Sequence, residues 1–313
     1  MELSLVVPCY NEQDNVRHFY DACCQAFAGH IDGYEIIFVN DGSKDNTWQE
    51  LDALWQQSDR VKLVNLSLNF GKEAAMYAGL QRAEGDFVTV IDADLQQHPD
   101  VVVDMVRFLR ANADYDCVAA YQQERREGKV LSFFKSCFYK LINRLCDIPF
   151  RAGASDFRTF RKDMAASILE LKEYFRFSKG IFSWVGYNTY FMPYEVRQRN
   201  AGSTSWSFRK LFKYAIGGIM AFTTKPLNIA TYLGGLSAVF SGLYMLVVII
   251  QKLCFGIDVP GYPTLVVLIL LIGGLQMMLL GIMGQYIAKI YMEGKHRPIY
   301  IAKEYRQCNE DAL

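Results

Sequence analysis

The residues best suited to chemistry are two aspartates, Asp92 and Asp94, followed by Gln96. They come directly after Phe87–Ile91, an apolar run of the kind that forms a buried strand. Carboxylates just past a parallel strand lie where open α/β sheets bind ligands. Such a pair suits Mg²⁺, which proteins hold with one or two carboxylates plus substrate phosphates. The alternative is that both aspartates cap the helix expected near Pro99, or face water.

The chain around these aspartates alternates predicted strands with predicted helices. Strands are expected at Leu3–Val7, Tyr34–Val39, Val61–Leu66, Phe87–Ile91 and Asp116–Ala120. Helices are expected from Glu12 onward, over Thr47–Gln57, from Lys72 to about Arg82, and over Pro99–Ala111. This alternation predicts an α/β fold with a doubly wound, mostly parallel sheet.

Polar residues follow four of these strands: Glu12, Asp41, Asn69 and the Asp92–Asp94 pair. The carboxyl ends of parallel strands meet at one edge, so we expect these residues to border one crevice. The sequence contains neither GxGxxG nor GxxxxGK[ST], which disfavours a Rossmann dinucleotide site and a P-loop. Without those phosphate cradles, a metal at Asp94 is the expected neutraliser of a diphosphate.

Composition narrows the class of protein. Hydrophobic residues make up 51% of the chain and the formal net charge is zero, so nothing suggests a nucleic-acid partner. The eight cysteines form no CxxC pair and no metal-ligand spacing. We therefore interpret them as small buried residues in a reducing compartment.

Two long uncharged segments follow, Leu227–Ile250 with 24 residues and Tyr262–Ala288 with 27. At about 1.5 Å per residue, each can cross a hydrocarbon core of about 30 Å. Lysine and arginine flank the pair on both outer sides, whereas the loop 251–261 carries only Lys252. The positive-inside rule therefore predicts a multi-pass membrane protein whose preceding domain and both termini are cytoplasmic. Glycines in both segments permit close packing, within a hairpin or between subunits of a homo-oligomer.

Basic and apolar residues are interleaved in two stretches before these segments. Residues 121–151 contain an apolar helical stripe, and residues 206–226 predict a juxtamembrane amphipathic helix. The first stretch either lies in the membrane interface or packs on the sheet with its charges in water. In the interfacial interpretation its cations meet a lipid phosphate, and the chosen residues are Arg125, Arg126 and Lys135.

Four segments, VVPCYNE, VNDGSKDNT, NFGKEAAMYAGL and DADLQQHP, stand in the order and spacing of family 2 glycosyltransferases of the GT-A fold. The match continues through ASDFRTF (154–160), FSKGIFSWVG (177–186), VRQRNAGST (196–204) and the two apolar segments. Over nearly its whole length the chain resembles the bacterial polyprenyl-phosphate glycosyltransferases. These are the bactoprenol glucosyltransferase group, related to dolichol-phosphate mannose synthase.

The resemblance implies roles for individual residues. It assigns the donor nucleotide to Pro8, Tyr10, Glu12, Asp41 and Asp92. It assigns Mg²⁺ or Mn²⁺ with the diphosphate to Asp92, Asp94 and Gln96, and catalysis to Asp94 and Asp156. Two positions depart from the family pattern. Ser155 stands where a Gly is frequent, and Ser205 stands where many members have a Lys, which leaves that phosphate contact to Arg199 or to nothing.

Asp156 has three candidate roles. The resemblance offers it as a general base, but a phosphate monoester with a second pKa near 6 is mostly dianionic at neutral pH and has little need of one. Asp156 is also followed by Arg158 and Arg161, which makes it a candidate structural partner of a cation. In the third role it orients the acceptor or steadies positive charge at the anomeric carbon.

These features together predict a cytoplasmic GT-A domain at 1–205, a juxtamembrane helix at 206–226, spans at 227–250 and 262–288 joined by an external loop, and a cytoplasmic tail at 289–313. The expected reaction is inverting transfer of a sugar, by resemblance glucose from UDP-glucose, to undecaprenyl phosphate for cell-envelope glycosylation. UDP-N-acetylglucosamine, UDP-galactose and GDP-mannose stay open as donors. A lipid-sugar flippase and a downstream glycosyltransferase are further candidate partners.

Two other functions are compatible with parts of this pattern. A processive polysaccharide synthase would usually carry a QxxRW motif and more spans, and neither is present. A non-catalytic scaffold that senses nucleotide sugars would have little need for Asp94 and Asp156 together.

Overall fold

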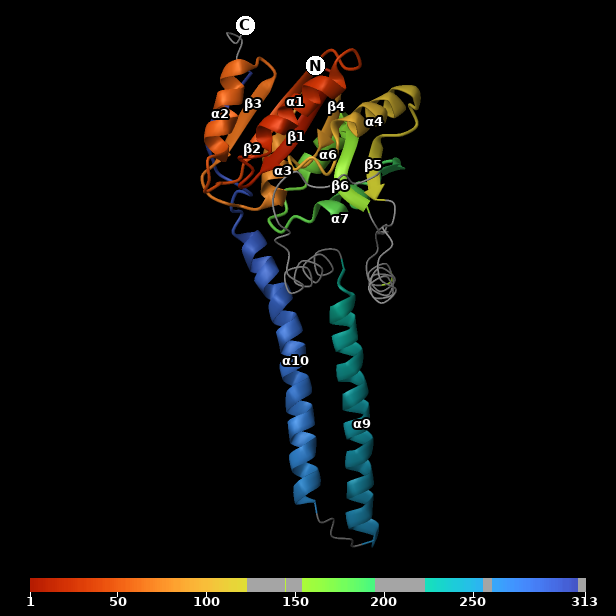
Figure 1. Cartoon of the computed structure of the whole chain (residues 1–313). Helices are drawn as coiled ribbons and strands as arrows, with labels where there is room; N and C mark the ends of the chain where they lie inside the picture. Colours follow the sequence, from red (N-terminus) through yellow and green to blue (C-terminus); the bar gives the residue numbers. More distant parts are fainter. Residues whose placement is uncertain (123–143, 145–153, 195–222, 256–260, 309–313) are drawn as a thin grey trace.

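The computed structural model describes residues 1–122, 144, 154–194, 223–255 and 261–308 (Figure 1). The sheet domain begins with nine alternating elements: β1 (Leu3–Cys9), α1 (Val16–Phe27), β2 (Tyr34–Asn40), α2 (Thr47–Gln57), β3 (Val61–Leu66), α3 (Lys72–Leu80), β4 (Phe87–Val90), α4 (Pro99–Ala111) and β5 (Cys117–Gln122). All five predicted strands and four predicted helices are present. The first helix starts at Val16 rather than at Glu12.

Three more strands complete the sheet: β6 (Ala154–Arg161), β7 (Thr189–Tyr194) and β8 (Ala302–Arg306). Over the described residues the strand order is β7-β5-β6-β4-β1-β2-β3-β8. The pairs β1–β2, β2–β3, β1–β4 and β5–β7 are parallel, whereas β6 pairs antiparallel with both β4 and β5. The predicted mostly parallel sheet is therefore confirmed, with antiparallel β6 inserted between β4 and β5.

Both faces of the sheet are covered, which explains why its strands are nearly continuous apolar runs. Leu3, Leu5 and Val7 of β1 pack in one buried cluster with α1, α2 and α4, while Val6 packs in the other with α3. The second cluster also includes α6 (Lys162–Glu170) and α7 (Ser178–Trp184). The sheet thus holds the loops at its strand ends between two helical layers.

Strands β1 to β4 run parallel, so their carboxyl ends share one edge, which we call the carboxyl edge. The turn after β2 packs tightly against the chain after β3 at this edge. Gly42 has φ +62°, and a Cβ there would lie 2.5 Å from the carbonyl carbon of Leu68. A larger residue would push these two loops apart.

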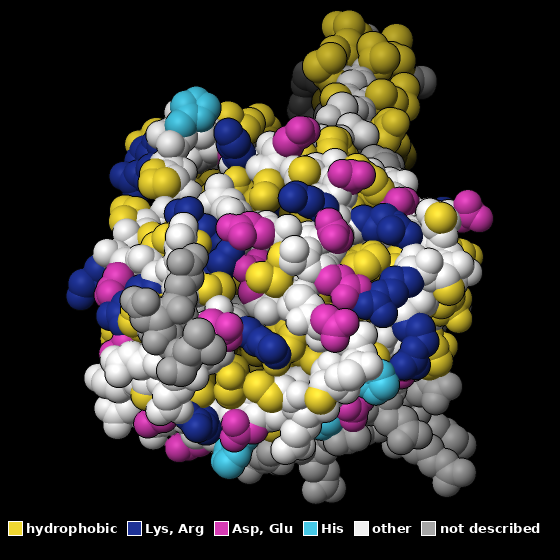
Figure 2. Space-filling model, turned by 90° about the horizontal axis from the view of Figure 1, so that it is seen from above, with side chains coloured by type: hydrophobic (Ala, Val, Ile, Leu, Met, Phe, Trp, Pro, Cys, Tyr) yellow, Lys and Arg dark blue, Asp and Glu magenta, His cyan; other side chains and the backbone are white. Residues whose placement is uncertain are grey.

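Two long helices, α9 (Lys225–Phe255) and α10 (Tyr262–Gly294), lie side by side and project from the sheet domain (Figure 1). Ala230–Gln251 and Leu265–Gly294 within them are long and apolar enough to cross a membrane. Their large side chains are exposed, as lipid-facing residues would be. Figure 2 shows the contrast, because acidic and basic side chains are interspersed over the sheet domain while hydrophobic ones cover the projecting part.

The segment after α10 returns to the sheet domain, which the sequence did not predict. Strand β8 pairs antiparallel with β3, with Val64 opposite Tyr305. The Trp55 indole N–H donates to the carbonyl of Gln307 at 2.6 Å, and the Tyr300 hydroxyl donates to Gln81 at 2.6 Å. The pair of apolar helices is therefore joined to the sheet domain on its C-terminal side as well.

Candidate functional site

The turn after β4 contains both aspartates of the predicted metal site. Asp94 Oδ1 accepts a hydrogen bond from the Gln96 backbone N–H at 3.1 Å, and its side chain is largely buried. Leu95 adopts φ +57°, a left-handed conformation that a branched side chain rarely takes. Asp92 interacts with Gln97, whose Nε2 lies 3.4 Å from Asp92 Oδ2. The hydrogen bonds of the two carboxylates therefore help to hold the conformation of this turn.

Neither aspartate caps the following helix, so the capping part of the alternative interpretation is wrong, although Asp92 is 33% exposed to water. The N-cap of α4 is His98, whose side chain accepts from the Asp100 backbone N–H. Pro99 occupies the first helical position, where its missing N–H costs nothing. Because His98 supplies the helix cap, the fold does not require Asp92 or Asp94 for capping.

Asp156 reaches the same edge from the amino end of antiparallel β6, where Arg158 stands opposite Val90 of β4. A lysine joins the two loops. Lys72 Nζ lies 2.5 Å from Asp92 Oδ1 and 3.8 Å from Asp156 Oδ2. The other oxygen of Asp156 is buried and has no hydrogen-bond partner among the described residues. Asp92, Lys72 and Asp156 thus form one charged cluster, which we call the Lys72 cluster.

The arginines that follow Asp156 are engaged elsewhere. The guanidinium carbon of Arg158 lies 3.9 Å from the centroid of the Phe182 ring, and Arg158 donates to the carbonyl of Ser155. Arg161 donates to backbone carbonyls, including that of Leu109 at 2.8 Å. Burial lowers the pKa of Arg158, and the charge of Asp156 acts in the opposite direction. Asp156 is therefore the partner of a cation, as one of its three candidate roles requires, although its described ion pair is with Lys72. The other two roles stay predictions.

Lys72 is the site residue that the sequence analysis missed. Burial opposes its charge, but the carboxylates of Asp92 and Asp156 outweigh this effect and raise the pKa of Lys72 above its ordinary value. Its position after the third strand, at the start of α3, was the available signal. Ser155 also gains a role, because its hydroxyl lies 3.3 Å from Gln97 Nε2 and so links β6 to the turn after β4.

Asp41 holds the loop that leads to Lys72. Its two carboxylate oxygens accept hydrogen bonds from the backbone N–H groups of Phe70, at 2.7 Å, and Gly71, at 2.9 Å. Burial raises the pKa of Asp41, although the two N–H donors act in the opposite direction. A donor-binding role for Asp41 stays a prediction, and it would have to coexist with these backbone bonds.

The other predicted donor residues border the end of β1. Pro8 lies within β1 opposite Val39, and the side chain of Tyr10 is exposed. The Glu12 backbone N–H donates to Thr47 Oγ1 at 2.8 Å, and its carboxylate accepts from Asn15 at 2.6 Å. The acceptor-phosphate residues Arg125, Arg126, Lys135 and Arg199 lie outside the described residues.

The donor set fits a hard divalent cation. Asp92, Asp94 and Gln96 offer carboxylate and amide oxygens, the ligand type that Mg²⁺ and Mn²⁺ prefer. Within the described ranges no group of three or more His, Cys, Asp or Glu residues could enclose a metal. A cation here would therefore need phosphate oxygens and water to complete its coordination.

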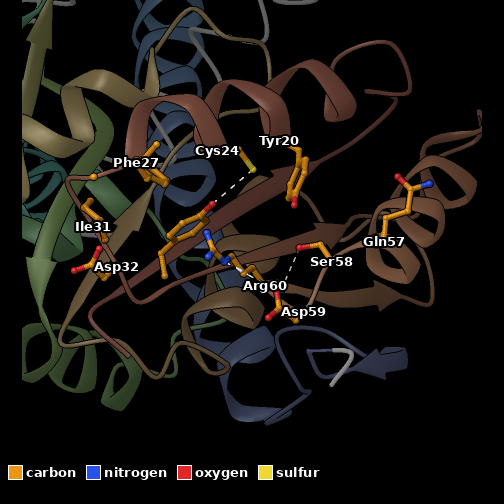
Figure 3. Close-up of a pocket in the computed structure, with 12 residues that line it drawn as sticks. Tyr20, Cys24, Phe27, Ile31, Asp32, Gln57, Ser58, Asp59 and Arg60 are labelled. Carbon is orange, nitrogen blue, oxygen red and sulfur yellow. Dashed lines mark hydrogen bonds and ion pairs between the residues drawn. The ribbon is translucent and has the colours of Figure 1, made fainter. Parts of the chain in front are cut away.

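A separate cavity lies at the opposite edge of the sheet, where α1 and α2 end (Figure 3). It has a volume of about 460 Å³ and is lined by residues that include Tyr20, Cys24 and Arg60. Arg60 lies over the Tyr34 ring, whose hydroxyl donates to Cys24 Sγ at 3.6 Å. This cavity contains none of the residues of the carboxyl edge, so we do not assign it to the candidate site.

Comparison with known proteins gives consistent matches. The sequence model described as Glycosyl transferase family 2 matches residues 4–169. An uncharacterised glycosyltransferase of Synechocystis is 40% identical over 97% of this chain and 95% of its own length. The bactoprenol glucosyl transferase of Shigella phage SfV is 39% identical over 98% of this chain and 100% of its own.

Solved structures are more distant. Glucosyl-3-phosphoglycerate synthase from Mycobacterium tuberculosis, solved with Mn²⁺, UDP-glucose and phosphoglyceric acid, is 18% identical. The match covers 69% of this chain and 76% of that chain, with a TM-score of 0.45.

Proposed function

Since the chain belongs to glycosyl transferase family 2 and is a glycosyltransferase of the GT-A type, we propose that it transfers glucose from UDP-glucose to undecaprenyl phosphate. The observation that carries this proposal is the Lys72 cluster, with Asp94 beside it, in a sheet domain attached to a hairpin of membrane-spanning character. A soluble donor needs such a polar edge, and a lipid acceptor needs that edge near a membrane. A relative named bactoprenol glucosyl transferase, matched over its whole length, supports the acceptor and the sugar.

In the proposed reaction an oxygen of the acceptor phosphate attacks the anomeric carbon as the bond to the diphosphate breaks. The configuration at that carbon is inverted, and the products are polyprenyl-phosphate glucose and UDP. A divalent cation bound at Asp94, with Asp92 and Gln96, would stabilise charge on the leaving diphosphate. Pro8, Tyr10, Glu12 and Asp41 are proposed to hold the nucleoside, and Asp156 to stabilise or orient the groups that react.

The acceptor phosphate is assigned to Arg125, Arg126, Lys135 and Arg199, whose guanidinium and ammonium groups suit a phosphate dianion. Fixing that phosphate in line with the leaving group would make the displacement effectively unimolecular. Charge reversal at Arg125 is expected to raise the apparent KM for the lipid phosphate far more than that for the nucleotide sugar.

The proposed orientation places the sheet domain and both termini in the cytoplasm, supported by the basic flanks of the two spans. Single cysteines are placed near Asp258 and near Glu304 in a background without the native cysteines. The first is expected to react with impermeant maleimide from outside the cell, and the second only after permeabilisation. The reverse pattern would overturn the orientation.

The function is tested by incubating membranes that contain the protein with undecaprenyl phosphate and a panel of labelled nucleotide sugars. Thin-layer chromatography then shows which label enters lipid. Label from UDP-glucose is expected to enter lipid. Label from UDP-N-acetylglucosamine, UDP-galactose or GDP-mannose in its place would correct the donor. If no label entered lipid from any donor, the acceptor assignment would be wrong.

A further inference from the structure

Lys72 is held in place by its own loop. Asp41 fixes the backbone N–H groups of Phe70 and Gly71, the two residues before it. Glu73, the residue after it, accepts hydrogen bonds from the backbone N–H and hydroxyl of Ser178 on α7. The backbone of Lys72 is thus anchored on both sides.

The Lys72 ammonium lies against a carboxylate that is also a predicted metal ligand. It is 2.5 Å from Asp92 Oδ1, while the side chains of Lys72 and Asp92 stay 42% and 33% exposed. A charge this close to Asp92 opposes a second cation there and favours an anion beside it. The exposed surface leaves room for that anion to approach.

We propose that Lys72 makes metal binding at this edge dependent on the nucleotide. Its ammonium disfavours a lone divalent cation at Asp92 and favours the same cation when a diphosphate accompanies it. Asp156, at 3.8 Å, provides a second carboxylate that keeps Lys72 at this edge once the metal competes for Asp92. The inference rests on the proposed function only in taking a nucleoside diphosphate as the ligand.

The test measures Mn²⁺ affinity by electron paramagnetic resonance in the purified full-length protein, without nucleotide and with UDP or GDP. Lys72→Met is compared with Lys72→Arg, which keeps the charge, and with Lys162→Met, which removes a charge from an exposed residue at the other end of β6. In Lys72→Met we expect Mn²⁺ alone to bind about tenfold tighter, and the gain from nucleotide to fall at least about fivefold. Lys72→Arg and Lys162→Met should behave as the unchanged protein does.

Equal Mn²⁺ affinities in Lys72→Met and Lys162→Met, with an equal gain from nucleotide, would overturn the inference. If Lys72→Met does not fold, Lys72→Gln gives the same comparison with a polar side chain. The measurement needs no sugar transfer. If the unchanged protein labels lipid in the donor panel but Lys72→Met leaves the Mn²⁺ affinity unchanged, this inference is wrong and the proposed function still stands.

Discussion

Two lysines of this molecule each face two carboxylates, and only one of them belongs to the candidate site. Lys62 of β3 is 5% exposed and lies 2.7 Å from Glu35 and 2.9 Å from Glu84. Glu35 is fully buried and also accepts from Ser4 Oγ at 2.6 Å. In the Lys72 cluster the lysine is 42% exposed and Asp92 is 33% exposed.

The difference separates a closed cluster from an open one. Glu35 and Lys62 are buried together, and burying these two charges is tolerable only because they are paired, while Glu84 joins them from the surface with a side chain that is 66% exposed. The Lys72 cluster keeps an accessible cation beside an accessible carboxylate, as a ligand site requires. Changes in the open cluster should therefore alter catalysis and leave stability nearly unchanged, and changes in the closed cluster should do the reverse.

The largest effect is expected for Asp94→Asn, because Asp94 lies in the same turn as Asp92 of the Lys72 cluster and is the main predicted metal ligand. We expect transfer to fall by at least about three orders of magnitude, because a catalytic metal contributes several kcal/mol of charge stabilisation. The melting temperature in detergent should change little, since the Oδ1 of an asparagine can accept the hydrogen bond that Asp94 accepts from the Gln96 backbone N–H. Undiminished activity of the unchanged protein in excess EDTA would remove the metal from the proposal.

Asp156→Asn tests the open cluster from its other side. We expect a loss of about a hundredfold, the range for removing a charge that stabilises a transition state. The acceptor phosphate, with a second pKa near 6, ionises unaided as pH rises. If Asp156 is a general base, the loss of activity in the mutant should therefore shrink between pH 6 and 8.5. If its role is electrostatic, the loss should be the same across this range. We expect the mutant-to-wild-type rate ratio to stay constant, and a tenfold climb would establish the base.

These residues also show how far the sequence could predict the molecule. Val61–Leu66, Thr47–Gln57 and Pro99–Ala111 formed as expected, because the hydrophobic pattern of each is local. Strand β6 was missed because it carries Asp156, Arg158 and Arg161, which do not look like a buried strand. Arg158 is tolerated there through its stacking on Phe182, a contact between residues 24 positions apart.

The roles of β8 and Lys72 were missed for the same reason, because each has partners that are distant in the sequence. Strand β8 has the polar sequence AKEYR, and its partner β3 precedes both α9 and α10 in the chain. Lys72 meets Asp156 only because β6 inserts beside β4. Local pattern predicts which residues follow each strand, but strand order decides which of them meet.

Lys62→Met tests the closed cluster. Removing the lysine leaves Glu35 charged and buried, which should lower the free energy of unfolding by about 3 kcal/mol. The KM values for donor and acceptor should not change in the protein that stays folded. The double variant Lys62→Met with Glu35→Gln removes the stranded charge and should recover part of the loss. If Lys72→Met proved equally destabilising, the distinction between the two clusters would fail.

The smallest effect is expected at Glu73. This residue follows Lys72 in sequence, but its carboxylate is bound within the protein, as that of Glu35 is. Its carboxylate accepts from Ser178, and burial raises the pKa of Glu73 although the Ser178 bonds act against this. An acid whose pKa is raised on folding destabilises the fold only above its unfolded pKa, where the unfolded chain has released the proton.

Glu73→Gln keeps an oxygen acceptor and removes the charge, so its stability should equal that of the unchanged protein near pH 4. As pH rises above the unfolded pKa of the glutamate, the variant should become more stable than the unchanged protein, and the difference should then level off. Melting temperatures of both proteins from pH 4 to 8 measure this difference. Transfer activity should stay within about twofold, because the glutamine still holds α7 through Ser178. A larger loss of activity with unchanged stability would show that Glu73 acts with the Lys72 cluster in the reaction. The distinction between an acid bound within the protein and an acid of the site would then be wrong for Glu73.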